Sequence, residues 1–264
     1  MSRAGKRILR WILSGVAVIV AAVLVLVGTV STAFVGIQPA QDGAALPGGA
    51  VLVKDGFSNV FILPAGIGRV ALVDCGMDPA AKAVKGALAK RGLGPEAVEA
   101  VFLTHGHPDH TGGCKAFPGA RLHAMAAEVG LVEGTASVRS PMTAFMHQPP
   151  KATGLKVARP LADGEIITVG PLAVQVLALP GHTPGSAAYL AGGTLYVGDG
   201  ARVAKDGALK NAAWVFSTDT GLAKASLQTV SRRLAAEGAT ATLVAPAHSA
   251  PAPLSALTGF AARP

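Results

Sequence analysis

The first pattern along the chain is a long apolar run near the N-terminus. Residues 11–37 carry no charged side chain and are rich in Val, Ala, Leu and Ile. At about 1.5 Å per residue, a helix of this length is longer than the ~30 Å hydrocarbon core of a membrane. Basic residues directly precede the run, namely Arg3, Lys6, Arg7 and Arg10. The pattern predicts a signal anchor, or transmembrane segment, within residues 1–37.

A cleaved signal peptide is the alternative for this segment. Small residues at 31–33 and 38–40 could serve as cleavage sites, but a signal peptide usually has a shorter apolar region of about 7 to 15 residues. No Lys or Arg follows the run before Lys54. The positive-inside rule therefore predicts a single-pass protein of the cytoplasmic (inner) membrane, with its N-terminus in the cytoplasm and the remainder periplasmic or extracellular. If the segment is cleaved, the protein is secreted.

The next residues are small, polar and rich in turn formers, so residues 38–49 are predicted to be a linker and residues 50–264 a globular domain. Short apolar runs separated by Gly and Pro predict strands at 51–53, 59–63 and 69–73. Residues 79–91 place Ala, Val and Leu at helical spacing, which predicts a helix that begins at Pro79 and ends before Gly92.

The second part of the domain repeats this order of strands and helices. A strand at 98–104 and a helix at 124–132 are followed by an irregular, Pro-rich stretch at 134–160. A helix at 220–236 and a last strand at 241–244 end the series. Between them, strands are predicted at 166–169, 172–179, 186–190 and 194–198. Two batches of strands, each followed by helix, predict an α+β fold with two sheets sandwiched between helices.

Composition excludes a disordered chain, and the distribution of charge argues against a nucleic-acid partner. Half of the 264 residues are hydrophobic and only 14% are charged, which is too apolar for a disordered chain. The net charge is +8, but the first ten residues carry four of these charges. Because the surplus does not form a basic stripe in the domain, nucleic acid is an unlikely partner.

Five of the seven histidines lie in short segments that also contain Asp and Gly. The densest is Thr104-His-Gly-His-Pro-Asp-His110, directly after a predicted strand. Alternate side chains of an extended segment share a face, so His105 and His107 project together. A turn at Pro108 can bring Asp109 and His110 to a neighbouring point. This segment therefore predicts a metal site.

Three later segments have the same form, because each places a potential ligand after an apolar strand and beside Gly or Pro. They contain His182, Asp199 and His248. Imidazole and carboxylate donors suit Zn²⁺, and Fe or Mn is also possible. Taken singly, each of these three residues could be an ordinary polar residue, so their interpretation as ligands depends on the complete set.

In these motifs the sequence resembles the metallo-β-lactamase superfamily of hydrolases over nearly all of residues 50–264. The resemblance implies a four-layer αββα sandwich with two Zn²⁺ at one edge of the two sheets. It also implies His105, His107 and His182 as ligands of the first metal, and Asp109, His110 and His248 as ligands of the second. Asp199 would bridge the two metals. Asp74 resembles an early aspartate of the family that supports the site without binding metal, although it could be a simple turn residue.

The function expected from this resemblance is a membrane-anchored hydrolase that uses a hydroxide between two metals. Asp109 is also a candidate proton donor to the leaving group. The substrate is expected to be a small ester, thioester, lactone or amide. The alternatives are a β-lactamase or a non-catalytic envelope binding module on the same fold. The oligomeric state stays open.

Several other residues near these motifs were considered. Cys75 and Cys114 could form a disulfide in a non-cytoplasmic domain or pack as two buried thiols, and the sequence leaves this choice open. His123 and His147 match no motif and are expected to be ordinary histidines. Between two ligand segments lie candidate substrate contacts for which no role is favoured: Arg202, Lys205, Lys210, Trp214 and Phe216.

Overall fold

The computed structural model describes residues 2–137, 139–146 and 149–263. These residues divide into two compact units, residues 1–36 and 37–264. The first unit contains α1 (Arg3–Ser31), which is long and apolar enough to cross a membrane. Its start is capped by the Ser2 hydroxyl, which accepts a hydrogen bond from the Gly5 N–H.

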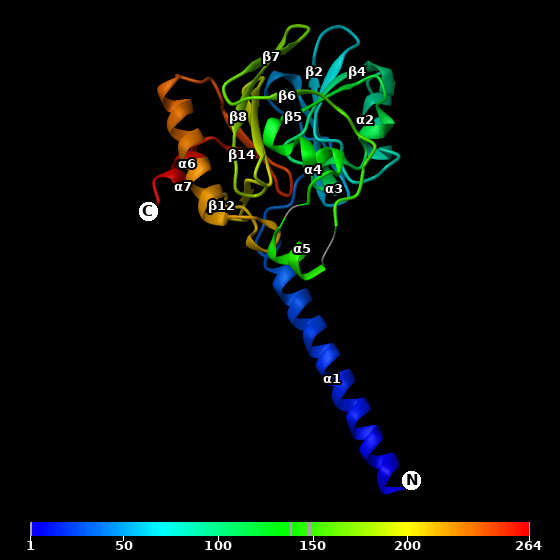
Figure 1. Ribbon diagram of the computed structural model, residues 1–264. Helices are drawn as coiled ribbons and strands as arrows, with labels where there is room; N and C mark the ends of the chain where they lie inside the picture. Colours follow the sequence, from blue (N-terminus) through cyan, green and yellow to red (C-terminus); the bar gives the residue numbers. More distant parts are fainter. Residues whose placement is uncertain (1, 138, 147–148, 264) are drawn as a thin grey trace. The chain divides into compact units, whose positions relative to one another are not determined.

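The second unit contains two six-stranded sheets (Figure 1). In the first sheet, antiparallel strands form one half and parallel strands the other. Its strands, in spatial order, are β1 (Val51–Asp55), β2 (Ser58–Pro64), β3 (Val70–Val73), β4 (Val98–Phe102), β5 (Arg121–Met125) and β6 (Val157–Leu161).

The second sheet is mainly an antiparallel meander, to which β13 adds in parallel beside β10. Its strands, in spatial order, are β14 (Ala252–Pro253), β13 (Leu243–Pro246), β10 (Thr194–Gly198), β9 (Ala187–Ala191), β8 (Leu172–Ala178) and β7 (Ile166–Val169). A separate hairpin follows β10 and consists of β11 (Ala201–Val203) and β12 (Leu209–Asn211).

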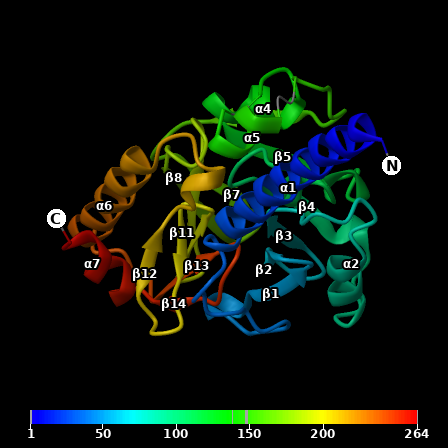
Figure 2. The ribbon, with the colours of Figure 1, turned by 90° about the horizontal axis from the view of Figure 1, so that it is seen from below.

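The helices and sheets of this unit lie in layers, which Figure 2 shows from below. Three apolar cores lie between four such layers. The central core lies between the sheets and includes Phe61, Phe102 and Tyr189. The second core packs α2 (Lys82–Ala89) on the first sheet, and the third packs α6 (Thr220–Ala236) and α7 (Ser255–Ala261) on the second sheet. Because both faces of each sheet are covered, central strands such as β2 are buried on both sides. The expected αββα sandwich is confirmed.

The longest helix of this unit follows directly from its sequence. The Asp219 carboxylate caps α6 by accepting a hydrogen bond from the Leu222 N–H. Small and branched apolar residues of the helix recur at helical spacing and face the second sheet. They are Ala223, Leu227, Val230 and Leu234.

Three sequence predictions of elements were wrong. The helix predicted at 124–132 forms only as α4 (Val129–Glu133), after a 3₁₀ turn at 126–128, because residues 121–125 form β5. The segment is composed of good helix formers, but the open edge of β4 binds it as a parallel strand. Residues 134–160 are not wholly irregular, because they contain α5 (Pro141–Met146) and β6. The predicted last strand is followed by β14 and α7.

The predicted linker, residues 38–49, contacts the domain. The Gln38 N–H donates to the Val203 carbonyl, and the Asp42 carboxylate accepts a hydrogen bond from the Lys54 N–H. Leu46 is buried in the central core. These contacts connect the segment to β1 and to the β11–β12 hairpin.

Candidate metal centre

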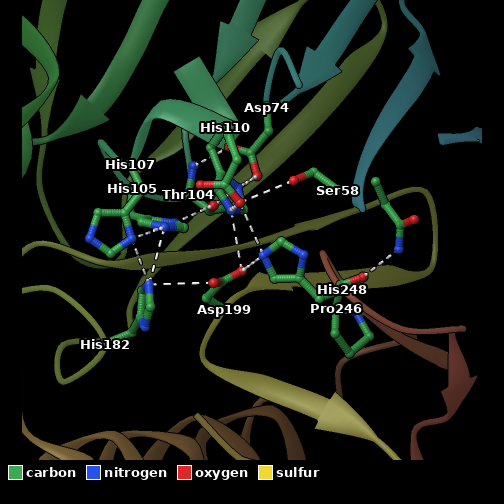
Figure 3. A network of polar contacts seen from close by, with 12 residues as sticks. Ser58, Asp74, Thr104, His105, His107, His110, His182, Asp199, Pro246 and His248 are labelled. Atoms are coloured by element: carbon green, nitrogen blue, oxygen red, sulfur yellow. Dashed lines mark hydrogen bonds and ion pairs between the residues drawn. The ribbon is translucent and has the colours of Figure 1, made fainter. Parts of the chain in front are cut away.

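The predicted ligands come together at one edge of the sandwich, where four strands end (Figure 3). His105 and His107 follow β4, and the next residues form the short helix α3 (Pro108–Thr111), which carries Asp109 and His110. The remaining three follow β8, β10 and β13, and they are His182, Asp199 and His248.

Three imidazole nitrogens form the first donor set. The Nε2 atom of His105 lies 3.0 Å from Nδ1 of His107 and 3.2 Å from Nε2 of His182. The His182 Nε2 and His107 Nδ1 atoms are 3.0 Å apart. Donors around a tetrahedral Zn²⁺ at about 2.0–2.1 Å are about 3.3 Å from one another. The triangle therefore has the size that one such cation requires.

The second donor set combines two imidazoles and a carboxylate. The Asp109 Oδ2 atom lies 3.3 Å from Nε2 of His110 and 3.2 Å from Nε2 of His248. The Nε2 atom of His110 is buried and has no hydrogen-bond partner among the described residues. A buried nitrogen of this kind fits a metal ligand better than a purely structural residue.

Asp199 connects the two sets through its two oxygens. Its Oδ1 atom is 3.3 Å from Nε2 of His110 and 3.0 Å from Nε2 of His248, on the side of the second set. Its Oδ2 atom is 3.4 Å from Nε2 of His182, on the side of the first set. Asp199 therefore lies between the two donor sets, with one oxygen toward each.

Four of the five imidazoles have their other nitrogen fixed by an outer contact. The Nδ1 atom of His105 is 3.1 Å from the Thr104 hydroxyl, and that of His182 is 3.1 Å from the Ser217 hydroxyl. The Nδ1 atom of His248 contacts the Phe57 carbonyl at 2.9 Å. Outer partners of this kind fix the ring orientation of metal ligands and leave Nε2 free for the metal.

Asp74 provides the fourth outer contact. Its carboxylate lies 2.8 Å from Nδ1 of His110 and accepts hydrogen bonds from the backbone N–H and the hydroxyl of Thr104. Asp74 is buried and has a positive φ of 61°. The carboxylate thus contacts Thr104 and His110, at the two ends of the segment that carries four of the predicted ligands. The position of Asp74 indicates that it supports the site and does not bind metal directly.

The pKa values of the imidazoles also differ between the two donor sets. Burial lowers the pKa of His105 well below its usual value and lowers the pKa of His182 to about 3, so both are neutral donors at pH 7. Burial alone would also lower the pKa of His248, but the carboxylates of Asp199 and Asp109 outweigh it and raise that pKa to about 10. The carboxylates of the second set therefore favour a positive charge at this position. A bound cation would supply that charge in place of protons.

The β1–β2 hairpin closes one side of the centre. The Ser58 hydroxyl donates to Oδ2 of Asp109 at 3.0 Å. The Asn59 amide donates to the Pro246 and Ser249 carbonyls on either side of His248. At the tip of the hairpin, Phe57 is about half exposed, with its ring 5.6 Å from the His248 ring.

Cys75 and Cys114 form a disulfide, which settles the choice that the sequence left open. The bond joins the residue after Asp74 to η3 (Cys114–Ala116), four residues after His110. The Cys75 N–H also donates to the His110 carbonyl. Both Cys residues come within reach because β3 and the loop after β4 end at the same edge, which spacing alone does not show.

The other residues considered in the sequence analysis belong to neither donor set. His123 is in β5, stacked on Phe102 between the sheets, and His147 lies outside the described residues. The Arg202 guanidinium donates to the Asn211 carbonyl across the β11–β12 hairpin, which also carries Lys210 and, in its turn, Lys205. Exposed Trp214 and partly exposed Phe216 occupy η5 (Trp214–Phe216), next to Ser217.

Sequence reasoning missed the residues that position the ligands. Thr104 and Ser217 are ordinary hydroxyl residues in sequence. Glu128, whose carboxylate accepts a hydrogen bond from the Gly106 N–H between His105 and His107, was taken as part of a helix. Ser58 directly precedes the strand predicted at 59–63 and lies about 50 residues before the Asp109 that it contacts. Thr104 carried one usable signal, because it directly precedes the first histidine of the cluster.

Comparison with known proteins identifies the family of this chain. The sequence pattern of the metallo-beta-lactamase superfamily matches residues 53–248. A hydroxyacylglutathione hydrolase from Gloeobacter violaceus is 32% identical over 154 residues, which cover 56% of this chain and 49% of the relative. Metallo-beta-lactamase domain-containing protein 1 from Homo sapiens is 35% identical over 111 residues, covering 42% of this chain and 34% of the relative. The chain spans about half or less of these relatives.

Solved structures share the fold. The Rm3 metallo-beta-lactamase superposes with a TM-score of 0.60 at 22% identity, covering 79% of both chains. A metallo-beta-lactamase family protein from Thermus thermophilus gives a TM-score of 0.56 at 25% identity, covering 82% of this chain and 77% of the other.

Proposed function

This chain belongs to the metallo-β-lactamase superfamily of metal-dependent hydrolases, and from that membership we propose that it is a dinuclear-metal hydrolase of small acyl substrates. The observation that carries the proposal is the pair of donor sets joined by Asp199. Five imidazoles and two carboxylates favour zinc, with iron or manganese as alternatives.

Each part of the centre has a chemical role in this proposal. Bound cations supply Lewis acidity, which lowers the pKa of water and polarises a carbonyl oxygen. Asp199 holds the two donor sets at a fixed separation, and Asp74 keeps the Nε2 atom of His110 directed into the centre. The Asp109 side chain is 22% exposed and accepts a hydrogen bond from the Ser58 hydroxyl. It is placed to receive a proton from water and pass it to the leaving group.

A thioester or related ester is the substrate class that we favour. The hydroxyacylglutathione hydrolases to which the chain is similar are named for the hydrolysis of an acylated thiol. A cleft of about 520 Å³ lies beside His107 and is lined mainly by apolar groups, with Lys115 and Lys151 among its residues. These features suit a substrate with a small apolar acyl group and an anionic part. A lactone or amide stays within the same chemistry.

A substrate panel tests the proposal. The purified full chain, with and without chelator, is offered a thioester, a lactone, a simple ester, a β-lactam and a phosphodiester. We expect chelator-sensitive turnover that is fastest on the thioester or ester, and loss of that turnover in a His107→Ala variant. Preferred turnover of the β-lactam would instead identify a β-lactamase. Bound metal without turnover on any compound would favour a binding module.

We also propose that the domain lies outside the cytoplasm, attached to the membrane by α1. The apolar helix α1 and the preceding basic residues support a single-pass anchor with the domain outside the cytoplasm. The Cys75–Cys114 disulfide supports the same assignment, because such bonds persist mainly in oxidising compartments.

A further inference from the structure

Glu128 is a buried carboxylate close to the candidate centre that contacts none of the predicted ligand side chains. It lies at the end of η4 (Ala126–Glu128), between β5 and α4, and is only 1% exposed. A carboxylate at this depth is costly unless hydrogen bonds compensate it. The contacts of Glu128 therefore indicate what the residue does.

The two oxygens of Glu128 accept hydrogen bonds from two different ligand loops. Oε1 accepts from the Gly106 N–H at 2.8 Å, and Gly106 lies between His105 and His107. Oε2 accepts from the Gly185 N–H at 2.8 Å and from the Thr183 hydroxyl at 2.9 Å, directly after His182. The three residues of the first donor set are thus joined through one carboxylate.

Steric contacts hold the same two loops against the Glu128 segment. A Cβ at Gly106 would lie 2.8 Å from both the Leu131 Cγ and the Val132 backbone nitrogen. A Cβ at Gly185 would collide with the Glu128 backbone nitrogen and lie 2.7 Å from its Oε2. Both loops therefore approach the Glu128 segment at backbone distance, with no side chain between them.

We propose that Glu128 is a positioning residue that clamps the loop from the first sheet to the loop from the second sheet and so sets the His105–His107–His182 triangle. Besides this clamp, a hydrogen bond from the Ala187 N–H to the Thr104 carbonyl joins the two segments, and outer contacts hold the rings of His105 and His182. The inference rests on the proposed metal centre, and it assigns to Glu128 the preorganisation of the first metal site.

A glutamine cannot replace this carboxylate. An amide has one oxygen and one NH₂ group, so it can accept from one loop only. Its NH₂ group would then face either the Gly106 N–H or the Gly185 N–H and Thr183 hydroxyl. Glu128→Gln keeps the size of the side chain and releases one of the two loops.

The experiment measures metal affinity in the full chain. Zn²⁺ is titrated into metal-free protein against a chromophoric chelator, and Co²⁺ absorption reports the ligand geometry. We expect Glu128→Gln to weaken one of the two binding steps by about 10- to 100-fold and to change the Co²⁺ spectrum. Glu133→Gln is the matched control, because Glu133 lies nearby in α4 and accepts from the Val157 N–H away from the ligand loops. It should bind both metals as the parent does.

Thermal unfolding of the metal-free proteins separates positioning from a purely structural role. A structural role predicts a lower midpoint with unchanged metal affinity well below that midpoint, and this result would overturn the proposal. If Glu128→Gln does not fold, Thr183→Val removes one of the three hydrogen bonds at similar size and should give a smaller loss of affinity. Equal affinity in Thr183→Val and the parent would then count against the clamp. A parent chain that binds no metal would refute the proposed function itself.

Discussion

His110 illustrates how much a single ligand depends on its neighbour. Its Nδ1 atom is held by the Asp74 carboxylate at 2.8 Å, while its Nε2 atom faces Asp109 and Asp199. A carboxylate behind an imidazole fixes the tautomer and makes the ring a stronger ligand. The orientation of His110, and with it the second donor set, therefore depends on the charge of Asp74.

Asp74→Asn tests this dependence. Asn tolerates the left-handed backbone at this position, so the fold should be retained. We expect the affinity for one of the two metals to fall by about 10- to 100-fold, as measured by competition with a chelator. The control is Asp55→Asn, a buried carboxylate that accepts the Met77 and Asp78 N–H groups and touches no predicted ligand. Unchanged affinity in Asp74→Asn would contradict the supporting role.

His123 leads to a different prediction, because it is buried but is not part of the metal centre. Burial, together with the positive charges of Arg121 and Arg159, lowers the pKa of His123 to about 4. Neither ring nitrogen has a hydrogen-bond partner among the described residues. Since the unfolded chain protonates this residue at its usual pKa of about 6.5, acid between pH 6.5 and pH 4 favours unfolding.

His123→Phe should therefore reduce the acid sensitivity of the domain. The Phe ring can take the stacked position on Phe102 and cannot be protonated. Allowing for solvent screening, we expect the parent to lose about 1 kcal/mol more of its unfolding free energy than the variant between pH 7 and pH 5. Urea unfolding with chelator present measures the difference. Parallel pH profiles for the two proteins would refute the assignment.

At the scale of single residues, the sequence predicted the metal ligands better than the residues that hold them in place. His105, His107, Asp109 and His110 form a dense motif whose residue types already define the chemistry. The partners Thr104, Ser217 and Glu128 are single polar residues, and their contacts exist only after distant loops meet. Nothing in the local sequence distinguishes such a residue from any other polar residue of a loop.

Among the elements, the disulfide connects the end of β3 to the segment that follows α3. It closes a loop with a sequence separation of 39 residues. In the chain-entropy account, a loop of this length stabilises the folded state by about 4 kcal/mol. The same cross-link holds Asp74 near the helix that carries Asp109 and His110.

Replacing both Cys75 and Cys114 by Ala should lower the unfolding free energy by about 4 kcal/mol relative to the oxidised parent. Urea unfolding in the presence of chelator keeps metal binding out of the comparison. The matched control is the parent unfolded in a reductant, which should approach the double variant. A double variant as stable as the oxidised parent would show that the cross-link contributes nothing to stability.

The sequence predicted elements well where the apolar pattern was long, and poorly where tertiary contacts decide. The 17-residue helix α6 has a clear apolar face, and its predicted bounds agree with the structure. The five residues of β5 have helix-forming side chains and become a strand only because β4 and β6 flank them. The short strands β11, β12 and β14 are held by their neighbours and carry little pattern of their own.

At the scale of the whole molecule, the apolar helix α1 leads to a prediction about where the protein is located in the cell. The full chain should sediment with membranes and resist extraction by alkali, because a helix as long and apolar as Arg3–Ser31 can span the bilayer. A chain that begins at residue 37 should be soluble. Mass spectrometry of the mature N-terminus distinguishes an anchor from a signal sequence. A mature protein that lacks residues 1–31 would contradict the anchor.

The metal content of the purified chain tests the central claim most directly. Elemental analysis after purification without chelator should find two equivalents of a divalent metal per chain, with zinc expected. Asp199→Ala, which removes the carboxylate between the two donor sets, should hold fewer than two equivalents. No bound metal in the parent, even after Zn²⁺ is added, would contradict the dinuclear centre on which the proposed hydrolase depends.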